Sequence, residues 1–429
     1  MQSKNWEPFP VPPDRIDAVL LTHAHLDHCG LLPRLVKQGF RGKILCTGPT
    51  ADIARIVMLD SARLQVEDAE QKRARHQREG RTGRFPAAPL YEEKDAQDAA
   101  SRFQVIELEK PATVGHGITA EFFEAGHILG AASIRVRLGA NGGERTVLFS
   151  GDIGRWDRPI INDPRPCDQA DYVLMESTYG DSLHDSDAQI GAALAKIITE
   201  TVSARGNLVI PSFAVERSQD ILWYLNDLLR SDRIPHLLVF LDSPMATKVT
   251  DVFSRWPQYF DVEMQEALRQ NRSPFDLPGL VMARSTDDSK AINRITGSVL
   301  IISGAGMCTG GRIKHHLVRN ISRPESCILF AGYQAEGTLG RQIVEGAAQV
   351  RILGQTLPVK ARVRRIEGFS GHADREELLR WASSLKKPPR QAFVIHGEPE
   401  IAEKFRGTLR AKLGWQASVP SPGQSVDIS

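Results

Sequence analysis

The feature that most constrains this chain is a dense group of potential metal ligands near its beginning. An apolar run of strand type, 18–22, is followed at once by His23, His25, Asp27 and His28. Four such residues within six positions are far denser than chance placement of 12 histidines would give. Neutral imidazole and carboxylate are ligands that zinc and other borderline divalent ions prefer. Alternation along an extended turn places His23 and His25 on one side of the backbone. Asp27 and His28 then point in other directions, so one segment can contribute ligands to two metal positions.

Composition excludes several classes of protein. A chain of 429 residues with 41% hydrophobic and 25% charged residues is ordinary for a globular protein, and its length indicates two or three domains. No apolar run approaches the ~20 residues that span a bilayer, and the first residues contain no apolar signal core. We therefore expect a cytoplasmic protein without a membrane partner. The five cysteines are scattered and form no C-x-x-C pair, which argues against disulfides and a cysteine zinc site.

Further candidate ligands follow other segments of strand type. His127, Asp152 and Glu176 each come shortly after such a segment, and His396 follows the apolar run 391–395. Open α/β layers place their sites just beyond the carboxyl ends of strands. Alone, His127 would more often be a structural histidine and Asp152 a turn residue. The assignment depends on their combination with the opening group.

Together these residues can form two metal positions. Three histidines and a carboxylate can hold one ion, and Asp27, His28 and His396 can hold a second. Asp152 could bridge them, because each carboxylate oxygen can bind a metal. Two ions ~3.5–4 Å apart can lower the pKa of a bridging water and bind a phosphoryl oxygen.

From about residue 185 the pattern changes to a regular alternation of strands and helices. Helical stretches such as 216–230 separate apolar segments of strand type at 208–212, 237–242, 298–303 and 327–331. This alternation is typical of a parallel sheet with crossover helices. We predict a second α/β domain, 185–355, inserted between two parts of a first domain, 1–184 and 356–429.

The motifs also resemble those of a known family. THAHLDH, EAGHILG and SGDIGR, in this order, are similar to the motif set of the metallo-β-lactamase fold. MESTYG, GFSGHAD and FVIHGE resemble motifs A, B and C of its β-CASP branch, and IPSFAVERSQ, SGAGMCTGGR and GYQAEGTLGRQ look like the inserted domain of that branch. The resemblance covers essentially the whole chain. It implies an α/β fold: an αββα metallo-β-lactamase sandwich with an inserted β-CASP domain that contains a parallel sheet.

The resemblance implies a zinc-dependent ribonuclease with two Zn²⁺ ions and single-stranded RNA as its partner. It would act as an endonuclease, with 5′-exonuclease action left open, and leave 5′-phosphate and 3′-hydroxyl ends after hydroxide attack. His396 stands at motif C where DNA-processing members carry an apolar residue, which favours RNA. Glu176 and His372 would form a carboxylate–imidazole pair, with His372 as general acid. A homodimer is left open.

The resemblance and the residue patterns together give a list of expected site residues. The catalytic residues expected are Asp27, Glu176 and His372. The metal ligands expected are His23, His25, Asp27, His28, His127, Asp152 and His396. The glycine-rich loop 303–311 follows a strand and precedes a basic stretch, so its N–H groups could hold an anion, although a tight structural turn is the alternative. The substrate-binding residues expected are Arg217, Ser243, Ser303, Gly306 and Arg312.

Two features leave alternatives open. Members of the family normally have several strands and an Asp-containing motif before the segment that begins at Thr22. We therefore expect missing leading strands, a bare sheet edge, exposed apolar side chains and weak activity. A catalytically weak or inactive RNA-binding or scaffold subunit is the main alternative to the enzyme, and a hydrolase of small esters is another. The basic run within 67–84 is either a solvated helix face or an arm that contacts phosphate.

Overall fold

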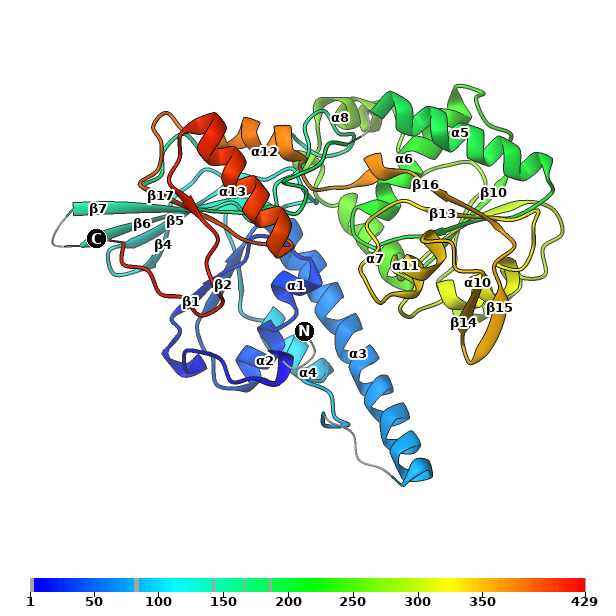
Figure 1. Ribbon diagram of the computed structural model, residues 1–429, viewed down its shortest axis with the longest axis horizontal. Helices are drawn as coiled ribbons and strands as arrows, with labels where there is room; N and C mark the ends of the chain where they lie inside the picture. The colour runs from blue at the N-terminus through cyan, green and yellow to red at the C-terminus, as the bar shows by residue number, and fades with distance from the viewer. Residues whose placement is uncertain (1–3, 81–84, 141–142, 166, 185–186, 429) are drawn as a thin grey trace. The chain divides into compact units, whose positions relative to one another are not determined.

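The structure, a computed structural model, describes residues 4–80, 85–140, 143–165, 167–184 and 187–428 (Figure 1). The chain divides into two compact units. Unit 1 contains residues 1–156, 163–181 and 374–429, and unit 2 contains residues 157–162 and 182–373. In the part of the chain that the structure describes, no helix is long and apolar enough to cross a membrane.

Unit 1 contains two sheets. The larger has seven strands in the order β18-β17-β8-β7-β6-β5-β4, and the smaller has three parallel strands in the order β1-β2-β3. In the larger sheet the strands from β7 to β18 run parallel, whereas β4 to β7 form an antiparallel meander. The strands are β1 (Ala18–Leu20), β2 (Lys43–Cys46), β3 (Phe103–Val105), β4 (Ala112–Gly115), β5 (Ile118–Glu124), β6 (Ala132–Ala140), β7 (Gly143–Phe149), β8 (Tyr172–Met175), β17 (Gln391–Val394) and β18 (Ala417–Ser418).

The two sheets of unit 1 enclose one apolar layer. Phe122 on β5 and Ile134 on β6 belong to the same buried cluster as Leu45 on β2. Alternate residues of β5 and β6 enter this layer, as the period of two along a strand requires. Figure 1 shows α2, α3 and α4 beside the smaller sheet and α12 and α13 beside the larger one, which gives the αββα order expected. The helices are α1 (Leu26–Cys29), α2 (Leu32–Lys37), α3 (Gly48–Glu79), α4 (Glu93–Ala100), α12 (Arg375–Ala382) and α13 (Pro399–Leu413).

Beyond β1, which lies at the edge of the smaller sheet, the larger sheet borders an apolar cavity of about 330 Å³. Leu20, Phe149, Tyr172 and Phe393 are among the side chains that line it. Phe149 remains 37% exposed. Apolar side chains of the larger sheet therefore line an open space here. The loss of stability expected from missing leading strands stays a prediction.

Unit 2 is built on a parallel sheet of six strands in the order β11-β10-β12-β9-β13-β16. Val209 and Ile301 pack with α10 on one face, whereas Leu208 and Leu300 pack with α5 and α6 on the other. Burial on both faces explains the continuous apolar runs in the sequence. The strands are β9 (Leu208–Pro211), β10 (Leu238–Asp242), β11 (Leu280–Met282), β12 (Val299–Ser303), β13 (Cys327–Phe330) and β16 (Arg362–Arg365), with a hairpin of β14 (Gln349–Ile352) and β15 (Gln355–Pro358). The helices are α5 (Asp187–Ser203), α6 (Arg217–Arg230), α7 (Pro244–Phe253), α8 (Val262–Arg269), α9 (Thr286–Ile292), α10 (Ile313–Asn320) and α11 (Leu339–Val344).

The structural division differs from the predicted domain boundaries at the second crossing. The sequence pattern places the return to the first domain at residue 356, whereas the chain rejoins unit 1 at Asp374. The reason is β16, which pairs with β13 in register from Cys327–Arg362 to Phe330–Arg365. A short segment, 157–162, also belongs to unit 2, where Ile161 bridges Phe260.

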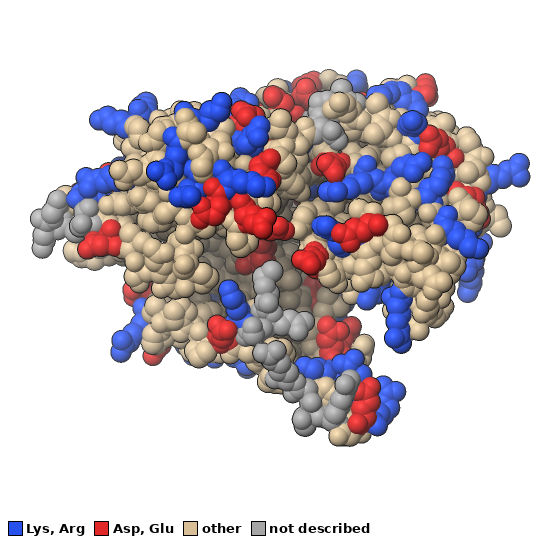
Figure 2. Space-filling model, viewed as in Figure 1, with Lys and Arg blue, Asp and Glu red and all other residues tan. Residues whose placement is uncertain are grey.

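The basic run in 67–84 continues α3 as far as Glu79. Lys72 Nζ donates hydrogen bonds to the carbonyl oxygens of Phe85 and Pro86, and Arg81 and Arg84 lie outside the described residues. Figure 2 shows Lys and Arg interspersed with Asp and Glu over the visible face. This mixture agrees with the small net charge of +2, and the phosphate-contacting arm stays a prediction.

Glu124 at the end of β5 gives unit 1 a testable pH dependence. Burial raises the pKa of this carboxyl from 4.5 to about 8, although the backbone N–H groups of Gly126 and Ala125 oppose the rise. Between these values the folded state keeps a proton that the unfolded chain releases, so stability declines as pH rises. Glu124→Gln should therefore raise the melting temperature by an amount that grows from pH 5 to pH 8.

The matched control is Glu144→Gln, because the Glu144 side chain is 60% exposed. A difference in melting temperature between Glu124→Gln and wild type that is constant across this range would contradict the assignment.

Candidate metal centre

The opening motif changes backbone conformation within a few residues, and this change directs its side chains. The chain leaves β1 extended, and His25 is still extended with φ −64° and ψ 149° as the N-cap of α1. Asp27 and His28 lie on α1 itself, in its single turn. Because the helix turns its side chains by about 100° per residue, Asp27 and His28 leave the backbone in directions different from those of His23 and His25, although the centroid of the His28 ring still lies 3.9 Å from that of the His23 ring.

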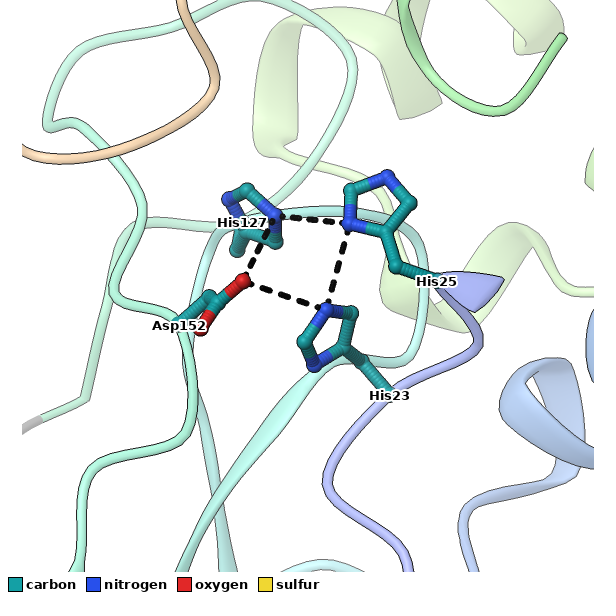
Figure 3. A group of neighbouring side chains, drawn as sticks. All are labelled: His23, His25, His127 and Asp152. Carbon is teal, nitrogen blue, oxygen red and sulfur yellow. Dashed lines mark hydrogen bonds and ion pairs between the residues drawn. The ribbon is translucent and has the colours of Figure 1, made fainter. Parts of the chain in front are cut away.

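The first ligand group contains His23, His25, His127 and Asp152, and Figure 3 shows their side chains converging. His25 Nδ1 lies 3.2 Å from His23 Nε2 and 3.2 Å from His127 Nε2. Asp152 Oδ2 lies 3.3 Å from His23 Nε2 and 3.7 Å from His127 Nε2. His23, His127 and Asp152 are at most 2% exposed, so this group lies beneath the surface of unit 1.

The second ligand group contains Asp27, His28 and His396. His28 Nε2 lies 3.3 Å from His396 Nε2, which in turn lies 3.4 Å from Asp27 Oδ2. The side chains of Asp27 and His396 are 65% and 34% exposed, so this group faces solvent.

Asp152, a member of the first group, also lies close to two residues of the second group. Its Oδ2 lies 3.5 Å from His28 Nε2 as well as close to His23 and His127, and its Oδ1 lies 3.3 Å from His396 Nδ1. The structure thus brings all seven predicted metal ligands together and places Asp152 between the two groups, where a bridging ligand was expected.

The spacing of these atoms fits a small divalent ion. Zinc bonds of about 2.0–2.1 Å in a tetrahedron place neighbouring ligand atoms about 3.3–3.4 Å apart. Four of the six pairs of ligand atoms in the first group are separated by 3.2–3.7 Å. Imidazole and carboxylate are also the donor types that zinc accepts.

Thr22 orients two of the histidines, a role that the sequence interpretation missed. Its Oγ1 lies 3.2 Å from His23 Nδ1 and 3.4 Å from His28 Nδ1. A hydroxyl oxygen has two lone pairs, so it can accept both Nδ1–H bonds and leave both Nε2 atoms unprotonated. The pairing fixes the tautomer that a metal needs. The available signal was a hydroxyl residue directly before the first histidine.

Glu176 holds the backbone of the loop that carries Asp152. It is fully buried, and its Oε1 accepts a hydrogen bond of 2.6 Å from the backbone N–H of Ile153. Its own N–H donates to Ser150 Oγ at 3.0 Å. The residues on either side of Gly151 and Asp152 are thus bonded to Glu176, and this holds the loop that presents the shared carboxylate.

Gly154 allows the loops of Asp152 and His127 to touch. Its N–H donates to the Ala125 carbonyl at 2.7 Å. A Cβ at this position would lie 1.6 Å from the Gly126 oxygen and 2.5 Å from the His127 nitrogen. Any side chain at Gly154 would therefore push the two ligand loops apart.

The protonation of the ligands differs between the groups. Burial lowers the pKa of His23, which favours the neutral, metal-binding form. The hydrogen bond with Asp27 raises the pKa of His396 to about 9. Burial acts to raise the pKa of Asp27, but the hydrogen bond from His396 and the nearby His28 hold it below its ordinary value. A metal at the second group must therefore displace a proton from His396.

The backbone of His396 is held in an uncommon conformation. Its φ is +50°, in the left-handed region that residues other than glycine rarely adopt. Its carbonyl accepts hydrogen bonds from the Ser177 N–H and from Thr178 Oγ1, which also lies 3.4 Å from His396 Nδ1. Such strained residues cluster at functional sites.

The remaining predicted catalytic residue, His372, lies in unit 2, immediately before the crossing to unit 1. Its N–H donates to Ser370 Oγ at 3.2 Å, and its carbonyl lies 3.1 Å from His184 Nε2. Glu176 lies in unit 1. Their pairing stays a prediction.

The predicted substrate-binding residues are mostly engaged within unit 2. Arg312 Nη1 donates to Asp242 Oδ1 at 2.7 Å and to the Ala283 carbonyl at 3.0 Å. Arg217 is buried and lies 3.3 Å from Asp220 Oδ2. Their predicted binding of RNA phosphate stays a prediction, and it would require these donors to be shared.

Ser243, Ser303 and Gly306 have structural partners as well. Ser243 Oγ caps α7 by accepting from the Ala246 N–H, and Ser303 Oγ donates to the Asp242 carbonyl. A Cβ at Gly306 would lie 2.9 Å from the Phe213 ring. These residues therefore lie where loops meet at the carboxyl edge of the parallel sheet.

Comparison with known proteins gives three family models along the chain. A beta-lactamase superfamily domain matches residues 1–202, a Beta-Casp domain matches residues 218–343, and a Zn-dependent metallo-hydrolase RNA specificity domain matches residues 356–420. The zinc-dependent family model and the converging His and Asp side chains together identify a metal-binding site.

Three relatives illustrate the similarity. A protein of Thermus thermophilus named as a ribonuclease is 36% identical over 427 residues, which cover 100% of this chain and 91% of the relative. An RNase J-like protein of Methanocaldococcus jannaschii is 29% identical over 416 residues, covering 96% of this chain and 89% of the relative. The transcription termination factor FttA of the same organism is 29% identical over 415 residues, but the match covers only 62% of that longer protein.

The role of Thr22 predicts a loss of metal affinity without loss of a ligand. Thr22→Val keeps the side-chain shape but removes the acceptor for two Nδ1–H groups. Metal affinity, measured by competition with a chelator, should fall about 10- to 100-fold, as is usual for partners behind the ligands.

Thr113→Val, at an exposed position on β4, is the control. Equal affinities for Thr22→Val and wild type would show that Thr22 does not orient the histidines.

Proposed function

The chain belongs to the β-CASP branch of the metallo-β-lactamase superfamily, and from this membership we propose that it is a metal-dependent ribonuclease. The ribonuclease of Thermus thermophilus and the RNase J-like protein, both matched over most of their lengths, support RNA as the substrate. The observation that carries the proposal is the pair of ligand groups that share Asp152. The first group is buried and the second faces solvent, so the second is accessible to a substrate.

We propose that two zinc ions occupy the site. The first would be held by His23, His25, His127 and Asp152. The second would be held by Asp27, His28 and His396, again with Asp152. Paired divalent ions lower the pKa of water and stabilise negative charge on a phosphoryl oxygen.

The protein residues proposed to act on the RNA are His372, Glu176 and Asp27. His372 would donate a proton to the departing 3′ oxygen, which leaves a 3′-hydroxyl and a 5′-phosphate. A carboxylate beside an imidazole keeps it charged and oriented, which is the role proposed for Glu176. Asp27, exposed and paired with His396, would orient the attacking water.

The substrate we propose is single-stranded RNA, cut internally, and the family resemblance adds cleavage from the 5′ end as a second mode to be tested. None of the ligands expected from the family motifs is replaced, which argues against an inactive RNA-binding subunit. Similarity to RNA-processing proteins supports a cytoplasmic location. A homodimer stays a prediction that light scattering on the purified protein would test.

The central experiment measures cleavage of end-labelled single-stranded RNA together with bound metal. Wild type should cleave RNA, lose activity to a chelator and regain it with zinc. His372→Ala should keep its metal but cleave about 10²- to 10⁴-fold more slowly, as for a lost general acid. His396→Ala should instead bind less metal.

His116→Ala, at an exposed position, controls for loss of a histidine elsewhere. If His372→Ala loses metal while His396→Ala retains it, the two roles are assigned the wrong way round. Wild type with full metal content and no cleavage of RNA would overturn the proposed function.

A further inference from the structure

Three loops of unit 2 meet at the carboxyl edge of its parallel sheet. They follow β9, β12 and β13, which are neighbours in the sheet. Phe213 follows β9, Gly306 lies in the loop after β12, and Gly332 and Tyr333 follow β13. Parallel α/β sheets bind ligands at this edge. The fold therefore places these loops where a ligand would be expected.

Gln334 holds two of these loops together. Its side chain is only 5% exposed, and its Nε2 donates to the carbonyls of Tyr333 at 3.0 Å and Gly306 at 3.1 Å, with Gly332 at 3.4 Å. A Cβ at Gly340 would lie 1.8 Å from Gln334 Oε1, so the start of α11 also packs tightly against this amide. A buried amide with these contacts fixes the backbone that carries Tyr333.

Aromatic side chains are nevertheless exposed on this fixed edge. Tyr333 is 41% exposed and Phe213 is 37% exposed. The Phe213 ring lies against Gly306 and Gly332, where a Cβ would be 2.9 Å and 3.7 Å from it. Flat rings held on rigid loops and facing solvent are what base stacking uses in proteins that bind single strands.

A cavity of about 140 Å³ adjoins Tyr333, and its lining includes two arginines together with the carboxylate of Glu345. Tyr333, Gln334, Arg341 and Arg365 are among its lining residues. Arg341 Nε pairs with Glu345 Oε1 at 2.6 Å, and Arg365 Nη1 pairs with Glu367 Oε1 at 3.0 Å. These pairs are exposed and therefore weak, and each guanidinium has five N–H donors. Each guanidinium therefore has N–H groups left that could donate hydrogen bonds to a phosphate.

We propose that this cavity is a subsite for one nucleotide of single-stranded RNA, in which the Tyr333 ring stacks on the base and Arg341 and Arg365 bind the adjoining phosphate. The subsite rests on the proposed function for its ligand but uses only residues of unit 2. An aromatic face with guanidinium groups beside it suits a nucleotide, whose base is flat and whose phosphate is anionic.

The test combines steady-state cleavage of labelled poly(A) with a binding signal that does not require cleavage. Tyr333→Leu should raise KM about 5- to 150-fold, the range for one lost base stack, and leave kcat unchanged. Tyr333→Phe should retain wild-type KM. Tyr333→Trp should retain it too, and its additional fluorescence should be quenched when poly(A) is added.

The charged part of the subsite has its own test. Arg341→Gln and Arg365→Gln should each raise KM and flatten its dependence on salt, because a phosphate contact is lost. Arg351→Gln, at an exposed position on β14, is the matched control and should change neither. Melting temperatures close to that of wild type would show that each variant is folded.

The outcomes separate the subsite from the enzyme activity. If wild type cleaves poly(A) and Tyr333→Leu has an unchanged KM, the subsite is overturned and the proposed function stands. If wild type cleaves no RNA but poly(A) quenches Tyr333→Trp, the subsite stands and the proposed function fails. Quenching by polyglutamate but not by poly(A) would indicate an acidic protein partner and overturn the subsite.

Discussion

The arrangement of unit 1 depends on one buried carboxylate, Asp152, which lies within 3.7 Å of ligand atoms from both groups. An isolated charge at 2% exposure would be strongly unfavourable, so the surrounding imidazoles and a metal have to compensate it. Sheet register brings those partners to it. β7 pairs with β8 and β8 with β17, and the loops that follow β7 and β17 carry Asp152 and His396 to the same edge.

Unit 2 does not disturb the ligand groups of unit 1, because it is inserted between two strands of the larger sheet that still pair with each other. The chain leaves unit 1 after β8 and returns before α12, so that β17 can still pair in parallel with β8. A parallel pair needs a long connection in any case, and here that connection is a whole α/β unit. Such an architecture gives the ligand groups of unit 1 and the carboxyl edge of the parallel sheet in unit 2 separate cores, so each can vary without unpacking the other.

Local patterns in the sequence predict much of this structure. The density of ligands in 23–28 identified the metal site, because few other arrangements need those residues so close together. Continuous apolar runs gave the central strands of unit 2, since strands buried on both faces carry apolar residues at every position. The resemblance to a known family supplied the αββα order, which periodicity alone does not contain.

What the sequence did not reveal are contacts that depend on long-range packing. In the sequence, Thr22 is an ordinary residue of a strand. Only the fold shows that its hydroxyl contacts two histidines. The glycine at 154 reads as a turn, whereas its function is to let two loops touch. The alternating, basic segment 359–364 resembles a half-exposed strand of the first domain, but its partner is β13 of unit 2. Arg312 appears available for phosphate until the fold places Asp242 beside it.

The order of the ligands along the chain also sets an order of assembly during synthesis. All four residues of the first group have been made once the ribosome has passed Asp152, so that a nascent chain can already gather them. His396 is made only after the whole of unit 2, and the second group cannot close before then. A growing polypeptide therefore has all residues of the first group well before it has those of the second. The topology thus places the synthesis of a whole α/β unit between the two ligand groups.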